Sequence, residues 1–91
     1  MENQFYKLSS GDDLFNSIYE LSEENKSPSF VLSAVGDLSQ CTFKCPQSEQ
    51  PIIIRKNLEI ISINGHFKRE EVHLHISASD ESCNVIGGHL L

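Results

Sequence analysis

Hydrophobic residues change their spacing at Pro28, and this change limits the folds that the chain can adopt. Before Pro28 they recur at intervals of three or four residues, and after it they recur at every second residue in short runs. The first spacing is typical of an amphipathic helix, and the second is typical of strands with one buried face. One helix followed by a series of strands predicts an α+β fold with a mainly antiparallel sheet.

The predicted helix covers Asp12 to Asn25, and its apolar stripe consists of Leu14, Phe15, Ile18, Tyr19 and Leu21. Ser10, followed three residues later by Asp13, resembles a capping box, and the carboxylate of Asp12 suits the positive end of a helix dipole. The helix should end before Pro28, because the residue ahead of a proline is pushed out of helical geometry.

Short strands account for the sequence after the helix. They are predicted at Phe30–Val35, Gln40–Cys45, Leu58–Phe67, Val72–Ser77 and Val85–Leu91, with a polar loop at Pro46–Pro51 and a solvated charged turn at Lys68–Glu71. Because side chains alternate between the two faces of a strand, one face of the longest strand should carry Leu58, Ile60, Ser62 and Asn64.

Length and charge exclude several classes of protein. With 91 residues the chain allows one domain, which we assign to residues 1–91. It has 7 Lys and Arg against 13 Asp and Glu, a net charge of −6, whereas DNA and RNA binding relies on cations that displace counterions from phosphates. No apolar run approaches the about 18 residues that span a bilayer, and no signal-peptide pattern begins the chain. With 3 cysteines and no disulfide framework, a soluble cytoplasmic protein is expected.

Three histidines form the strongest candidate site: His73 and His75 in an H-L-H motif, and His89 after Gly87-Gly88. Residues two apart on a strand share a face, so the Cα atoms of His73 and His75 should lie about 6.6–6.8 Å apart, a spacing from which two imidazoles can converge on one ion. A hairpin turn within Asp80–Asn84 pairs His89 with either His75 or His73, and both registers place all three side chains on one face. The glycines leave room beside His89 for a ligand or a close neighbour.

Two interpretations of these histidines are open from the residues alone. In the first, three neutral imidazoles with an open fourth position bind zinc, or another divalent transition metal. In the second, the histidines are half-buried residues that are hydrogen-bonded to backbone or to a neighbouring subunit. The fourth histidine, His66, lies at the end of the predicted strand Leu58–Phe67 and is interpreted as an ordinary surface residue.

The other reactive side chains indicate no further site. Cys41 and Cys45 should share a strand face with Phe43 and are interpreted as buried, inert thiols rather than metal ligands. The acidic stretch Glu20–Glu24 is interpreted as the solvent face of the helix. Acyl transfer is not supported, because no G-x-S-x-G elbow surrounds any of the serines near predicted strands, which are Ser33, Ser39, Ser77 and Ser79.

Four segments resemble, in this order, the PPC domain family, whose name stands for plant and prokaryote conserved: Gly36–Phe43, Leu58–Gly65, His73–His75 and Gly87–Leu91. The resemblance extends from about Tyr6 to Leu91, and its most specific part is H-L-H together with G-G-H-L-L. It implies a curved antiparallel sheet with one helix, association as a trimer, and a metal site at His73, His75 and His89, as proposed for prokaryotic members. In plants the domain follows a minor-groove-binding AT-hook and serves oligomerisation and partner recruitment.

The chain departs from the family pattern in three places. It has no Arg-Gly-Arg-Pro hook, so the DNA-binding label of the family does not carry over. Cys83 stands where a turn glycine is usual, which leaves Asn84 as the expected left-handed residue, since asparagine tolerates positive φ. The family continues beyond G-G-H-L-L with another strand, so the chain is expected to be either a shortened member of the family or a fragment of one. A vacant sheet position beside Val85–Leu91 then predicts a homo-oligomer, a trimer by resemblance, that forms at this strand edge.

Two classes of function are retained. The first is a trimeric metal-binding domain, for which the sequence places no general base that would establish catalysis. The second is an interaction module for assembly or regulation, whose histidines are structural. A DNA-binding regulator ranks third, because only the usual label of the family suggests it. The sequence indicates no substrate.

Overall fold

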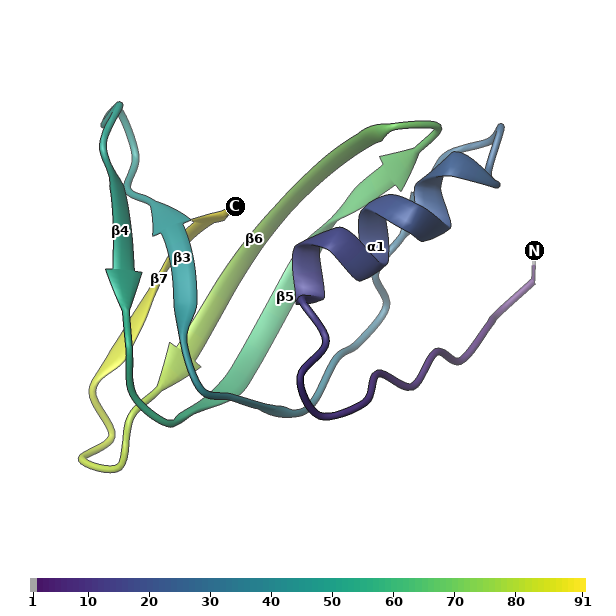
Figure 1. The fold of residues 1–91 in the computed structure, drawn as a ribbon. Helices are drawn as coiled ribbons and strands as arrows, with labels where there is room; N and C mark the ends of the chain where they lie inside the picture. The colour runs from purple at the N-terminus through teal and green to yellow at the C-terminus, as the bar shows by residue number, and fades with distance from the viewer. Residues whose placement is uncertain (1) are drawn as a thin grey trace.

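A computed structural model describes residues 2–91 as one helix packed against one face of a curved antiparallel sheet (Figure 1). The elements are α1 (Leu14–Glu23), β1 (Ser29–Phe30), β2 (Asp37–Leu38), β3 (Cys41–Lys44), β4 (Pro51–Ile54), β5 (Leu58–Lys68), β6 (Glu71–Ser79) and β7 (Val85–Leu90). The strands follow the order β1-β5-β6-β7-β3-β4, and β2 also pairs with β5. The predicted α+β class is therefore confirmed. Within residues 2–91, no helix is both long and apolar enough to cross a membrane.

The hydrophobic core lies between α1 and the sheet, which explains the stripe on the helix. Leu14, Phe15 and Ile18 of this stripe pack against a buried cluster that consists of Cys41, Phe43, Leu58, Ile63, Leu74, Ile76, Ala78 and Leu90. Leu74 of β6, at the centre of the sheet, is 0% exposed. The burial of Cys41 and Phe43 confirms the face predicted for them, and burial raises the pKa of the Cys41 thiol.

The helix begins at Leu14, and its N-cap is a different residue from the predicted one. The carboxylate of Asp13 accepts a hydrogen bond from the backbone N–H of Asn16 at 2.8 Å, so Asp13 is the N-cap and the capping role predicted for Ser10 is wrong. The carboxylate of Asp12 accepts the N–H of Ser9 at 2.8 Å and closes the turn that precedes the helix. The helix ends at Glu23, two residues before the predicted end.

The end of α1 is tied to the tip of the β5–β6 hairpin. The hydroxyl of Ser22, which is 0% exposed, accepts the backbone N–H of Glu70 at 3.1 Å and donates to the carbonyl of Tyr19. The carbonyl of Asn25 accepts the N–H of Arg69 at 2.9 Å. Arg69 and Glu70 have positive φ angles of 26° and 67°, the left-handed geometry of a two-residue hairpin turn. The helix end thus supplies partners for a turn whose residue types do not favour it.

A β-bulge in β5 changes which side chains face the core. Ile60 lies opposite Ala78 and Ser62 lies opposite Ser77, so Ile61 is an extra residue in β5. Beyond the bulge, Ile63 is buried whereas Asn64 and His66 point away from the core; the prediction that Leu58, Ile60, Ser62 and Asn64 share one face is wrong after Ile60. The bulge therefore places His66 on the face opposite the helix.

The edge of the sheet beside β5 is only partly a strand. Residues 29–38 keep one register with β5, but only β1 and β2 form ladders, so the strand predicted at Phe30–Val35 is wrong for most of its length. Between them, the N–H of Val31 donates to the carbonyl of Gly65 at 3.0 Å. The register would place Val35 opposite the bulge, which explains why regular pairing stops there.

The last strand of the chain is not at an edge. β7 lies between β6 and β3, and the carbonyl of Thr42 accepts the N–H of Leu91 at 3.0 Å (Figure 1). The predicted vacant position beside Val85–Leu91 is therefore wrong, because the distant strand β3 fills it. β4, whose pairing with β3 was not predicted, forms the edge on this side of the sheet.

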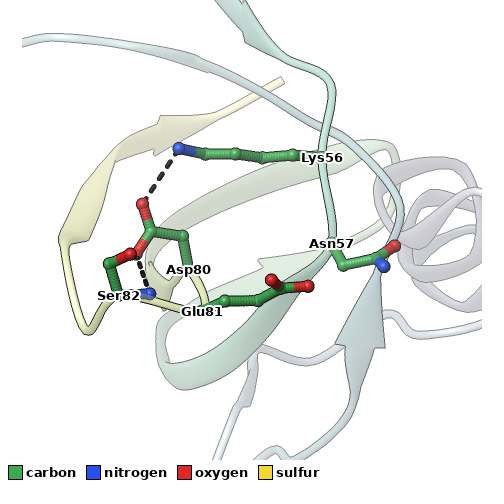
Figure 2. A pocket seen from close by; sticks show the side chains of 5 residues that line it. All are labelled: Lys56, Asn57, Asp80, Glu81 and Ser82. Atoms are coloured by element: carbon green, nitrogen blue, oxygen red, sulfur yellow. Dashed lines mark hydrogen bonds and ion pairs between the residues drawn. The ribbon is translucent and has the colours of Figure 1, made fainter.

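One carboxylate organises the turn between β6 and β7. Asp80 accepts the backbone N–H groups of Ser82 and Asn84, each at 2.9 Å, and its other oxygen accepts the ammonium of Lys56 at 2.9 Å (Figure 2). The Lys56 ammonium, followed by the Asn84 N–H, holds the pKa of Asp80 well below its usual range. Cys83 has a φ of 64°, so the prediction that Asn84 would take the left-handed conformation is wrong. The N–H of Asn84 is instead committed to Asp80.

We expect Cys83→Gly to stabilise the fold by about 0.5–1 kcal/mol, because glycine removes the steric cost of positive φ and gives back only part of this gain as unfolded-state entropy. Cys83→Ala is the matched control: it removes the thiol but keeps the β-carbon that causes the strain. Urea unfolding of the three proteins measures the difference. Equal stabilities of the glycine and alanine variants would contradict this account of the turn.

Candidate metal centre

The structure brings together the three predicted histidines on the open face of the sheet. His73 and His75 project from β6, and His89 projects from β7 directly opposite His75, which is one of the two predicted registers. One ring nitrogen of each lies within 4.8 Å of those of the other two. The ring centroids are 5.0 Å apart for His73 and His89, 5.2 Å for His73 and His75, and 5.9 Å for His75 and His89. The three side chains therefore converge.

The donor set fits a divalent transition metal. Nitrogens that each lie 2.0–2.1 Å from one tetrahedral ion are about 3.4 Å apart, a spacing that side-chain rotation can reach from nitrogens within 4.8 Å of one another. His73 and His75 are exposed and His89 is half-buried, so solvent can reach the cluster. None of the side-chain hydrogen bonds found among residues 2–91 engages these three imidazoles. Within the described chain, their nitrogens are available to a ligand.

The protonation of His89 also suits metal binding. Burial lowers the pKa of the His89 imidazole, and the positive charges of His73, His75 and Lys44 lower it further. Lys44 lies directly opposite His89 on the neighbouring strand β3. A lowered pKa favours the neutral imidazole, which is the form that binds a metal.

His66 is a member of this histidine face that sequence reasoning missed. It lies opposite His73 across β5 and β6, and the two rings are stacked with centroids 5.7 Å apart and planes 18° apart. Phe30 contacts the other side of His66 with its ring centroid at 6.0 Å. His66 is exposed, as predicted, but its ring also belongs to the histidine face. A two-residue turn at Arg69-Glu70 would have predicted the pairing of His66 with His73.

The two glycines before His89 serve close packing of strands rather than an open space. A β-carbon on Gly87 would lie 2.2 Å from the carbonyl oxygen of Ile76, and one on Gly88 would lie 2.5 Å from that of Lys44. Of the two roles predicted for these glycines, the close neighbour is the one that the structure shows. They let β6 and β3 approach β7 on both sides and so fix the position of His89.

The remaining candidates do not join the cluster. Ser77 is hydrogen-bonded to Ser62 at 2.7 Å, and Cys41 and Cys45 lie on the strand face opposite Lys44. A shallow hollow at the β6–β7 turn, far along β6 from His73, is lined by Lys56, Asn57, Asp80, Glu81 and Ser82 (Figure 2). Asp80 and Lys56 already bind each other there, so this hollow has a structural explanation.

Fold and cluster together define a small α+β domain that presents histidines on an open sheet face. The chain belongs to the Plants and Prokaryotes Conserved (PCC) domain family, whose family model matches residues 1–91. This confirms the resemblance noted from the H-L-H and G-G-H-L-L motifs.

Two relatives are proteins named bifunctional protein GlmU from Synechococcus strains. The chain is 39% identical over 61 residues to that of strain JA-3-3Ab, which covers 67% of this chain and 10% of the relative. It is 34% identical over 85 residues to that of strain JA-2-3B'a(2-13), which covers 92% of this chain and 13% of the relative. The chain thus spans about a tenth of the length of these proteins.

Two solved structures share the fold. A hypothetical protein of Salmonella cholerae-suis superposes with a TM-score of 0.88 at 22% identity, covering 92% of this chain and 62% of that one. A candidate DNA-binding protein of Bacteroides thetaiotaomicron superposes with a TM-score of 0.71 at 23% identity, covering 86% of this chain and 59% of that one. At these identities the likeness shows the fold alone.

In metal-free protein, we expect the imidazole of His89 to titrate below the ordinary value of 6.5. His73→Asn should raise the pKa of His89 only part of the way, because burial, the larger cause, remains. Between the lowered pKa and 6.5, the imidazole of His89 binds fewer protons in the folded chain than in the unfolded chain. The contribution of His89 to the free energy of unfolding therefore falls as pH decreases from 6.5 through the lowered pKa. An NMR titration of the histidine ring signals measures both values, and a His89 pKa at or above 6.5 would contradict the predicted environment.

Proposed function

We propose that this PCC domain binds one divalent transition metal ion per chain through His73, His75 and His89, with zinc as the first candidate. The observation that carries the proposal is the convergence of three imidazole nitrogens to within 4.8 Å on an accessible face. Three neutral nitrogen ligands are the set found in zinc sites that keep a fourth position open, and copper, nickel or iron accept similar ligands.

When bound, such an ion supplies Lewis acidity and an open coordination position. The chain's own contribution is to hold the three rings: the pairing of β6 with β7 fixes His75 against His89, and the stack of His66 on His73 orients the third ring. No carboxylate of the described chain is paired with these histidines across the sheet, so no general base is assigned. The proposal is therefore a binding function.

A second candidate is an assembly or regulatory module whose histidines are structural. Its support is that the match to each GlmU relative occupies only 10% and 13% of that protein, so this segment forms a small part of a larger chain there.

We further propose that the domain works in the cytoplasm as a homo-oligomer, a trimer by family resemblance, and does not bind DNA by itself. The net charge of −6 opposes DNA binding. Arg55 and Lys56 lie in the loop between β4 and β5, whereas Lys68 and Arg69 lie at the far tip of the β5–β6 hairpin (Figure 1). Lys56 is also neutralised by Asp80. These cations form no common stripe.

Untagged protein is expected to take up one zinc ion per chain, and His75→Ala to lower the zinc affinity by more than about 100-fold without unfolding the domain. His66→Phe is the control, since it removes the ring nitrogens of an exposed histidine outside the ligand group but keeps an aromatic ring that can stack on His73. Elemental analysis and calorimetric titration give stoichiometry and affinity. Binding should weaken as pH falls through the imidazole range, because the ligands must be neutral. Absence of uptake, or equal loss in both variants, would overturn the proposal and leave the interaction module.

Sedimentation at micromolar concentration is expected to show a trimer. We place the contact at residues 29–38, because Phe30, Leu32 and Val35 are 69%, 75% and 90% exposed at a sheet edge with incomplete pairing. Leu32→Glu with Val35→Glu should then give a monomer, whereas Phe5→Glu, which changes an equally exposed residue outside the sheet, should not. A wild-type monomer that is stable to dilution contradicts the oligomer.

A further inference from the structure

The surroundings of the histidine cluster are positive or neutral, although the chain as a whole is acidic. Across the sheet, His75 lies opposite Asn64 and His89, and His73 lies opposite His66. His89 lies opposite Lys44 on its other side. No residue paired with the three histidines across the sheet carries a carboxylate, although the chain has 13 acidic residues.

The nearest carboxylates along the strands do not cancel this charge. Glu71 is two residues from His73 on β6, and it lies opposite Lys68 at the hairpin end, so a cation on the same face offsets its charge without forming an ion pair with it. Glu59 lies opposite Ser79, at the other end of β6. Among residues 2–91 the only ion pair joins Lys56 to Asp80, so Lys44 has no carboxylate partner within the described chain.

Lys44 is placed to act at the cluster itself. Residues directly opposite each other on antiparallel strands have β-carbons about 4.5–5.5 Å apart on the same face, and the four-carbon stem of lysine reaches well beyond that distance. Lys44 is half-buried, so much of its aliphatic stem lies against the sheet, on the strand directly beside His89. The backbone fixes this arrangement, because Gly88 lets β3 approach β7 closely at Lys44.

We propose that the histidine cluster, once loaded with metal, selects a small anionic ligand such as a carboxylate, and that Lys44 is the residue that gives this selectivity. The inference rests on the proposed metal-binding function and adds the chemical class of the ligand. Three neutral imidazoles leave the full charge of a divalent ion uncompensated, and the Lys44 ammonium beside them adds to it. A small anion is attracted by both charges, whereas a neutral ligand of the same size gains nothing from Lys44.

The test uses full-length protein loaded with cobalt(II), whose visible spectrum reports a change of ligand at the metal. Acetate is the anionic probe and imidazole the neutral probe, both titrated at constant ionic strength and at a pH above the pKa of imidazole, where that probe is uncharged. Lys44→Met should weaken acetate binding about 3- to 10-fold, the effect of one unit charge at this range in a partly solvated site, and leave imidazole binding unchanged. Lys44→Arg should restore acetate binding.

Lys68→Met is the matched control, because it removes a lysine from the same face and changes the net charge equally, but that lysine is opposite Glu71. It should leave the acetate affinity as in the wild type. The inference is overturned if loaded wild-type protein does not bind acetate, if Lys44→Met affects both probes equally, or if the two lysine variants behave alike. In those cases cobalt uptake persists and the metal-binding proposal stands. Failure to take up cobalt overturns both.

Discussion

The antiparallel pairing of β5 with β6 is the constraint on which the rest of the structure depends. These are the two longest strands, and they carry the centre of the core on one face and three of the four histidines, His66, His73 and His75, on the other. β1 and β2 pair with β5, β7 pairs with β6, and α1 packs on both strands. The bulge at Ile61 is what keeps this pairing compatible with a continuous core, because the apolar residues of β5 change parity there while those of β6 do not.

The same pairing leaves one face of the sheet open to solvent, where polar side chains cost little desolvation free energy. α1 covers only one side of the sheet, so side chains on the other side are free of packing demands, and imidazoles can gather there without the desolvation cost of a core. Gly87 and Gly88, which lie close to the carbonyl groups of Ile76 and Lys44, let the neighbouring strands approach β7 tightly around His89. A rigid backbone thus presents ligands that remain accessible, which is the combination that a binding site on a small domain requires.

Much of the fold and of the site was accessible from the sequence, because both depend on local periodicity. Alternation predicted the strands β3, β5, β6 and β7, and arithmetic on one hairpin predicted that His89 faces either His75 or His73, of which the structure shows the first. Features set by distant parts of the chain were not accessible. The pairing of β3 with β7, which removes the expected free edge, joins residues that are far apart in sequence. The bulge at Ile61 has no local marker, since isoleucine suits a regular strand equally well.

The hydrogen bonds between α1 and the β5–β6 hairpin bear on the order in which the domain folds. With 10 residues, α1 is shorter than helices that persist alone in water, so most of its stability must come from the surface on which it docks. The hydrogen bond between the Ser22 hydroxyl and the Glu70 N–H joins residues 48 positions apart in sequence. Forming it therefore costs the entropy of closing a long loop. The β5–β6 hairpin is closed by a two-residue turn, so its first contacts do not require the closure of a long loop. We therefore expect the hairpin to form first and to provide the surface on which the N-terminal helix docks. The stability of α1 then depends on two strands that follow it in the sequence.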